Sequence, residues 1–164
     1  MITNQLVIIR PVKRGDQTIL AELLSDRQTI KDSGIQLPDP DNKAAFQWAL
    51  DTLVKKGNGL WLITERSSKC PAGIMSLVPT DKGLELGYLL GPAFRGRGLM
   101  TSAVKLLLEH LGQRTEAVLV TASTSLNNLA SQRVLQRAGF QCLPVRNNEQ
   151  EHCWQWLTQK IEKK

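Results

Sequence analysis

Short runs that alternate apolar and polar residues dominate the first ninety positions of the chain. Such alternation is typical of strands with one face buried. It predicts strands over residues 6–10, 60–65, 73–78 and 84–90. The connections between the last three runs, at 67–69 and 80–83, are short and polar. These three runs therefore predict two hairpins that form an antiparallel meander.

Apolar residues at helical spacing separate the first strand from the meander. Asp16 can cap a first helix, and Asp41 begins a second helix that ends at Gly57, with Trp48 in the core. The stripe of the first helix consists of Ile19, Leu20, Leu23 and Leu24. Residues 27–40 contain a glycine and two prolines without a sustained period, so they predict a loop with at most a short helical turn.

The second half of the chain alternates helices with strands. The pattern predicts a helix over 99–111, a strand over 117–123, a helix over 128–138 and a strand over 153–157. With 164 residues, of which 41% are hydrophobic, the chain can bury one core. We therefore predict a single domain over 1–164 of the α/β (α+β) class, with a mixed, mostly antiparallel sheet flanked by helices.

Composition narrows the class of protein further. No run approaches the roughly 20 apolar residues of a membrane span, and no secretory signal precedes the first strand, so a cytoplasmic location is expected. Cys70, Cys142 and Cys153 lack the spacing of a zinc site, and no metal is expected. The net charge of +6 suits a polyanionic ligand or an RNA partner, but no nucleic-acid-binding motif accompanies it.

An arginine- and glycine-rich loop follows the strand at 84–90. Gly96 and Gly98 can adopt positive φ, and the start of the next helix would point backbone N–H groups at an anion. Arg95 and Arg97 can add positive charge at the same place. The loop has neither the third glycine of a dinucleotide fingerprint nor a GxxxxGK[ST] motif. It predicts a phosphate-binding loop of another kind.

This loop resembles the acetyl-CoA pyrophosphate loop of the GNAT superfamily of N-acetyltransferases. In the family pattern Gln/Arg-x-x-Gly-x-Gly/Ala, Arg95 and Gly98 occupy the first and fourth places. Met100 departs from the pattern at the sixth place, where its side chain is expected to crowd the pyrophosphate. The segment from Asn128 to Gly139-Phe140 is similar to the family's helix that begins with Asn and ends in Gly-Phe.

The opening residues and the late helix are similar to one branch of the superfamily, the N-terminal (alanine/serine) acetyltransferases of ribosomal proteins. The matching features are Val7-Ile8-Ile9-Arg10-Pro11 followed by Gly15-Asp16, and the pair Asn128 and Ser131. The resemblance implies a sheet whose central strands splay apart after Leu90 and hold acetyl-CoA between them. It implies cofactor contacts from Tyr88, Leu89, Leu90, Arg95, Gly96, Arg97, Gly98, Leu99, Met100, Thr101 and Asn128.

The chemistry implied is direct transfer of an acetyl group to a primary amine. Glu85 is the candidate base because it lies on the strand that leads to the donor. The alternative is that Glu85 is simply a solvent-facing residue of that strand. Many superfamily members protonate the thiolate with a tyrosine seven places after the Asn, where this chain has Leu135. Ser131, one helical turn from Asn128, is the candidate substitute. Asn128 could equally be a helix N-cap, with Asn127 sharing that role.

The acceptor is the least determined part of the prediction. The resemblance favours a protein N-terminus, with small polyamines or aminoglycoside-like amines as alternatives, and places the acceptor pocket near 27–40 and 143–151. No membrane or direct DNA partner is expected, and the protein could be a monomer or a homodimer. Two other classes stay open: a non-catalytic acyl-CoA-binding domain, and a basic RNA- or ribosome-binding protein.

Overall fold

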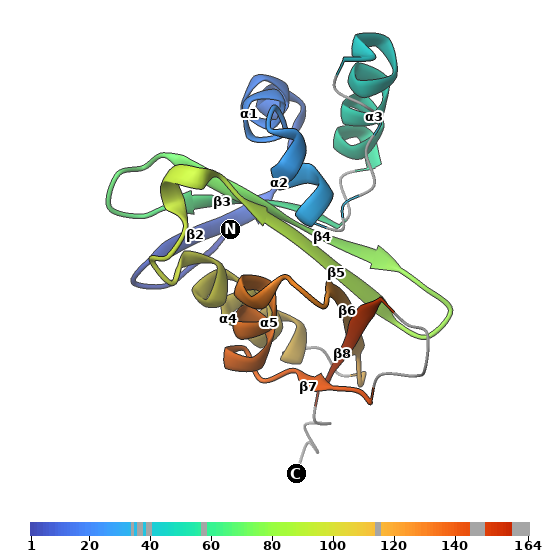
Figure 1. Cartoon of the computed structure of the whole chain (residues 1–164). Helices are drawn as coiled ribbons and strands as arrows, with labels where there is room; N and C mark the ends of the chain where they lie inside the picture. Colours follow the sequence, from blue (N-terminus) through green and yellow to red (C-terminus); the bar gives the residue numbers. More distant parts are fainter. Residues whose placement is uncertain are drawn as a thin grey trace.

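An eight-stranded sheet forms the centre of the computed structural model (Figure 1). The structure describes residues 1–33, 35, 38, 41–56, 59–113, 116–144 and 150–158. The strands are β1 (Ile2–Thr3), β2 (Val7–Pro11), β3 (Leu60–Glu65), β4 (Pro71–Pro79), β5 (Leu84–Leu90), β6 (Leu119–Ser125), β7 (Gln141–Cys142) and β8 (Glu151–Leu157). Their order in the sheet is β1-β2-β3-β4-β5-β6-β8-β7.

Every neighbouring pair of strands is antiparallel except β5 and β6, which run parallel. The pairing of β5 with β6 consists of Leu84 with Val120 and Glu85 with Thr121, within the described residues. Beyond Glu85 the two strands separate, while β4 stays paired with β5 as far as Leu90. This geometry confirms the predicted mixed, mostly antiparallel sheet with splayed central strands, but the strands separate after Glu85 and not, as expected, after Leu90.

Helices cover both faces of the sheet (Figure 1). On one face lie α1 (Gln17–Leu23), α2 (Arg27–Asp32) and α3 (Lys43–Lys56), and on the other lie α4 (Leu99–Gly112) and α5 (Leu129–Arg137). Two short 3-10 turns, η1 (Arg14–Asp16) and η2 (Pro92–Phe94), precede α1 and the glycine-rich loop. None of the helices in the described ranges is long and apolar enough to cross a membrane.

The two faces of β5 belong to two different cores. Leu86 packs into the core beneath α4 and α5, whereas Leu89 packs into the core beneath α1. Successive side chains of a strand point to opposite faces, so Glu85 and Gly87 share the face of Leu89, and Tyr88 shares that of Leu86. The predicted alternation is therefore correct, and each face contributes at least one leucine to a core because helices cover both faces.

Several boundaries on the first face differ from the predictions. Trp48 was expected in the core, but it is 69% exposed, while its neighbours Phe46 and Ala49 on α3 are buried. Helix α3 begins at Lys43, and Asn42 rather than Asp41 caps it by accepting from the Ala45 N–H at 3.2 Å. The predicted stop at Gly57 lies outside the described residues.

The segment predicted as a loop over 27–40 begins with helix α2. Asp26 caps this helix because its carboxylate accepts from the Gln28 N–H at 3.2 Å. The sequence pattern did not predict the full length of α2, because six residues are too few to display an amphipathic period. The acceptor region predicted at 27–40 and 143–151 is only partly within the described ranges.

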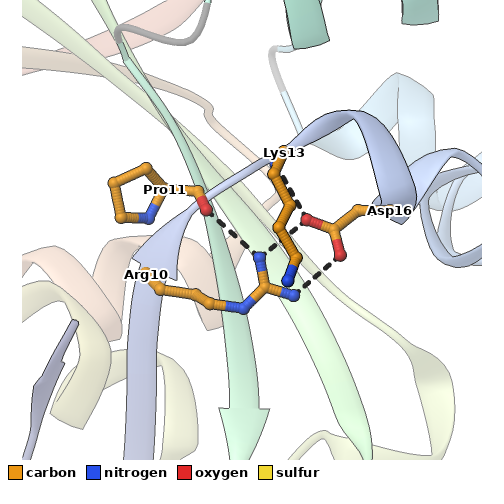
Figure 2. Close-up of polar contacts among 4 residues, drawn as sticks. All are labelled: Arg10, Pro11, Lys13 and Asp16. Carbon is orange, nitrogen blue, oxygen red and sulfur yellow. Dashed lines mark hydrogen bonds and ion pairs between the residues drawn. The ribbon is translucent and has the colours of Figure 1, made fainter.

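Asp16 plays a different part from the predicted cap of α1 (Figure 2). Its two carboxylate oxygens accept from both terminal nitrogens of Arg10, each at 2.7 Å, and its Oδ2 also accepts from the Lys13 N–H at 2.9 Å. The Asp16 side chain is almost fully buried, and the Arg10 guanidinium is the main cause that lowers its pKa. The pair joins the end of β2 to the start of α1.

Candidate active site

An open cavity of about 420 Å³ lies where β5 and β6 diverge. Its walls come from the end of β5, the glycine-rich loop, the first turns of α4 and α5, and helix α2. The predicted site residues that line it are Tyr88, Leu89, Leu90, Arg95, Gly96, Gly98, Leu99, Met100, Thr101, Asn128 and Ser131. Two segments that are distant in the sequence, the loop and the start of α5, therefore meet in one cavity.

The glycine-rich loop has the backbone conformation that its sequence predicts. Gly96 and Gly98 have φ of 72° and 73°, in the left-handed region that disfavours side chains. Gly98 is the N-cap of α4, so the backbone N–H groups of Leu99, Met100 and Thr101 belong to the first helical turn. All three residues line the cavity. A helix start of this kind favours an anion such as a pyrophosphate.

The two arginines of the loop have separate partners. Arg95 lines the cavity, where its Nε donates to the Leu90 carbonyl at 3.1 Å and its Nη2 donates to the Thr29 hydroxyl at 2.6 Å. Arg97 forms an ion pair with the buried Glu65 and does not line the cavity. The predicted contribution of Arg97 to cofactor binding stays a prediction, and its side chain is held at the end of β3.

Met100 has most of its side chain within the core beneath α4. It is 7% exposed and contributes to the cavity wall near the glycine-rich loop. Leu135, at the position where the superfamily's tyrosine is expected, is fully buried in the same core. A side chain there could not reach the cavity without disrupting the packing of α5 against the sheet.

The start of α5 brings a hydroxyl pair into the cavity. Asn128 is the N-cap of α5, because its Oδ1 accepts from the Ser131 N–H at 3.1 Å. The Ser131 Oγ lies 2.7 Å from the Tyr88 hydroxyl, and the Ser131 carbonyl oxygen lies 3.1 Å from the same hydroxyl. Burial raises the pKa of Tyr88 to about 12, so this phenol is protonated at neutral pH. The sequence predicted only main-chain contacts from Tyr88 and did not anticipate this side-chain pair.

Glu85 lies outside the cavity wall. It is exposed, at the last paired position before β5 and β6 separate, and on the face of β5 opposite to Tyr88. An added Cβ at Gly87, two residues further along this face, would come within 3.3 Å of the Ile35 side chain and 2.8 Å of the Ser76 hydroxyl. Ser33 and Ile35, which follow α2, thus lie close to this face of β5. The role of Glu85 as a base stays a prediction.

Sequence reasoning missed four polar side chains of the cavity wall. They are Thr29 of α2, Ser33 at the C-cap of α2, and Arg133 and Arg137 of α5. The two arginines are four residues apart and so lie on the same face of the helix, a spacing that the sequence displays. Together with Arg95 they make the cavity positively charged, which suits a ligand with several phosphates. Among the described residues there is no cluster of His, Cys, Asp and Glu that could hold a metal.

Two curated relatives are named as acetyltransferases. The chain is 27% identical over 169 residues to the "Uncharacterized N-acetyltransferase YjdG" of Bacillus subtilis, an alignment that covers 93% of this chain and 99% of that protein. It is 38% identical over 55 residues to the "Probable N-acetyltransferase YjcK" of the same organism. That shorter alignment covers 34% of this chain and only 30% of that relative's length.

Solved structures share the fold. A ribosomal L7/L12 α-N-protein acetyltransferase in complex with coenzyme A aligns with a TM-score of 0.71 at 18% identity, over 94% of this chain and 95% of that one. A spermidine N-acetyltransferase from Vibrio cholerae, in complex with coenzyme A and spermine, aligns with a TM-score of 0.74 at 13% identity, over 96% and 98%. The acetyltransferase (GNAT) domain model matches residues 7–141, and the chain therefore belongs to the GNAT acetyltransferase family.

Proposed function

We propose that this protein transfers an acetyl group from acetyl-CoA directly to the N-terminal amine of a protein. The observation that carries the proposal is the single cavity that joins an anion-binding helix start to a hydroxyl pair at the gap between β5 and β6. A donor with phosphates at one end and a thioester at the other would span these two features. The family membership supports the same ligand.

The phosphate end of acetyl-CoA would lie at the glycine-rich loop. Backbone amides from Gly96 to Thr101 would bind the pyrophosphate, and Arg133 and Arg137 would supply positive charge from α5. The edge of β5 that β6 leaves after Glu85 offers the backbone groups of Tyr88, Leu89 and Leu90 to the pantetheine amides. In this pose the Leu89 region would also present an N–H group to the thioester carbonyl.

The transfer needs an amine on one side of the carbonyl carbon and the sulfur on the other. The neutral amine attacks the carbonyl, the C–S bond breaks, and the nitrogen loses a proton to Glu85 or to water. Ser131 would donate a hydrogen bond to the departing sulfur, which then takes its proton from solvent. Glu85 and Ser131 lie on opposite faces of β5, an arrangement that suits these two separate roles.

Charge favours a peptide acceptor over a polyamine. The chain carries a net charge of +6, which would repel a polycation such as spermidine and attract acidic peptides. The pair Asn128 and Ser131 at the start of α5 is the feature that resembles the branch acting on ribosomal-protein N-termini. The proteins that share the fold include enzymes named for each kind of amine, a ribosomal-protein acetyltransferase and a spermidine N-acetyltransferase.

A screen of acceptors tests the proposal. Acetyl-CoA would be mixed with the protein and with peptides whose N-terminal residue is alanine or serine, spermidine, or an aminoglycoside, and thiol release would be measured. We expect faster release with the peptides, and the acetyl group at the α-amine by mass spectrometry. Acetyl-CoA binding without release for any amine would instead support an acyl-CoA-binding domain. Salt-sensitive RNA retention without acetyl-CoA binding would support an RNA-binding protein.

A further inference from the structure

A hydroxyl pair links two walls of the candidate active site. Tyr88 comes from β5 and Ser131 from the first turn of α5, and their hydroxyl oxygens lie 2.7 Å apart. Both residues line the cavity. Tyr88 is also the only tyrosine in the chain, so its chemistry can be changed and observed at a single site.

The number of hydroxyl protons limits which of these two groups can donate to the other. The Ser131 carbonyl, 3.1 Å from the Tyr88 hydroxyl, can only accept, and each hydroxyl has a single proton. If Tyr88 donates to the carbonyl, Ser131 donates to Tyr88 and its proton is directed away from a ligand. If Tyr88 donates to the Ser131 Oγ, the Ser131 proton can turn into the cavity. The shorter of the two distances is the one to the Oγ.

We infer that Tyr88 is a positioning residue for acetyl transfer, which donates to the Ser131 Oγ and thereby directs the Ser131 proton to the departing sulfur of acetyl-CoA. This inference rests on the proposed function. It gives the chain a substitute for the tyrosine that Leu135 replaces, built on a strand and acting through a serine. Tyr88 itself does not touch the sulfur, and no proton leaves it during the reaction.

Two features keep the pair in this arrangement. The Asn128 cap fixes the first turn of α5, because it accepts from the Ser131 N–H. The pKa of Tyr88, raised by burial to about 12, keeps the phenol a donor at every pH at which the protein is expected to work. A donor that polarises a second donor strengthens the second hydrogen bond, and the gain is largest as negative charge develops on the sulfur.

A double-mutant cycle tests the inference, with thiol release measured on the best peptide of the acceptor screen. Tyr88→Phe removes one oxygen atom and should lower kcat roughly tenfold, the effect of one hydrogen bond, while the KM for acetyl-CoA changes less than about twofold. In the Ser131→Ala background, Tyr88→Phe should have no further effect on kcat. In the Ser131→Thr background, which keeps a hydroxyl, the loss should return.

The possible results distinguish a failure of the proposed function from a failure of the role inferred for Tyr88. If the wild-type protein releases no thiol with any acceptor, the proposed function is wrong and this inference falls with it. Alternatively, the wild-type protein is active, but Tyr88→Phe lowers kcat by the same factor in the wild-type and Ser131→Ala backgrounds. Tyr88 then does not act through Ser131, and the inference alone is overturned.

A second variant guards against poor folding of Tyr88→Phe. Because Tyr88 is the only tyrosine, growth on 3-fluorotyrosine replaces it uniquely with a residue of similar size whose hydroxyl is a stronger donor. Fluorination should raise kcat in the wild-type background and leave the Ser131→Ala protein unchanged. Equal effects in the two backgrounds, or no effect in either, would overturn the inference.

Discussion

The guanidinium of Arg95 donates a hydrogen bond of 2.6 Å to the hydroxyl of Thr29, which ties the glycine-rich loop to helix α2. Thr29 is 3% exposed, and its hydroxyl donates in turn to the Asp26 carboxylate at the start of α2. Arg95 also reaches the Leu90 carbonyl at the end of β5. One chain of hydrogen bonds therefore connects the glycine-rich loop, the end of β5 and helix α2.

Replacing Thr29 should show how strongly this chain supports the loop. Thr29→Val keeps the shape but removes the buried hydroxyl that Arg95 and Asp26 share as a partner, so the free energy of unfolding should fall by about 1 kcal/mol. Acetyl-CoA should also bind more weakly by calorimetry, because the loop loses its anchor on α2. Thr29→Ser is the matched control and should keep both properties. Equal behaviour of the Val and Ser variants would show that the hydroxyl is unimportant.

Gly98 should be required for its backbone conformation. Its φ is 73°, and an added Cβ would meet nothing within 4 Å, so strain rather than a clash opposes a side chain there. Gly98→Ala should lower the free energy of unfolding by about 1–2 kcal/mol. Gly112→Ala, at the other end of α4 with equal space and no positive φ, should not destabilise the protein.

A larger substitution at Gly98 tests whether the glycine-rich loop binds acetyl-CoA. Gly98→Val should abolish the rise in melting temperature that acetyl-CoA gives the wild-type protein, since a β-branched residue cannot hold this turn and present the helix amides. NAD and ATP should give the wild-type protein no comparable rise. A full acetyl-CoA response in Gly98→Val would remove the loop from the binding site.

Local sequence patterns were sufficient to predict the antiparallel meander and the backbone conformation of the glycine-rich loop. The prediction for 84–90 coincides with β5, because the alternating residues lie between a polar turn and Gly91-Pro92. The positive φ of Gly96 and Gly98 also follows from local chemistry, since few other residues adopt it. These features depend on neighbours in the sequence, which a pattern can display.

Features that depend on distant residues were missed. Trp48 lies on an amphipathic helix, and only the packing of α3 against α1 decides that Phe46 and Ala49 face inward. The ion pair of Arg97 with Glu65 could not be predicted, because Glu65 is 32 positions earlier in the chain. The contact between Tyr88 and Ser131 likewise requires the strand order of the finished sheet.

The ion pair of Arg10 and Asp16 should make stability depend on acid pH. The pKa of Asp16 is lowered in the folded protein, so the pair stabilises the fold above the usual carboxylate pKa of about 4 and is lost as the pH falls through the folded value. Asp16→Asn leaves the Arg10 charge without its partner and should cost about 3 kcal/mol at pH 7 by denaturant unfolding. The deficit should shrink in acid.

The exposed Asp81, in the turn between β4 and β5, provides the control for this pH dependence. Asp81→Asn should change stability by less than about 0.5 kcal/mol at either pH. An Asp16→Asn deficit that stays constant from neutral to acid pH would show that packing, and not the charge pair, carries the effect.

The role of Glu85 can be read from the pH dependence of turnover. If its carboxylate accepts a proton from the amine nitrogen of the acceptor, wild-type kcat/KM should rise with pH through one ionisation, and Glu85→Gln should flatten or move that limb. Acetyl-CoA binding should be unchanged, because Glu85 does not line the cavity. Glu109→Gln, an exposed acid on α4, is the control and should keep the wild-type profile. An unaltered profile in Glu85→Gln would mean that the protein only positions the reactants, with water accepting the proton and the amine entering already neutral.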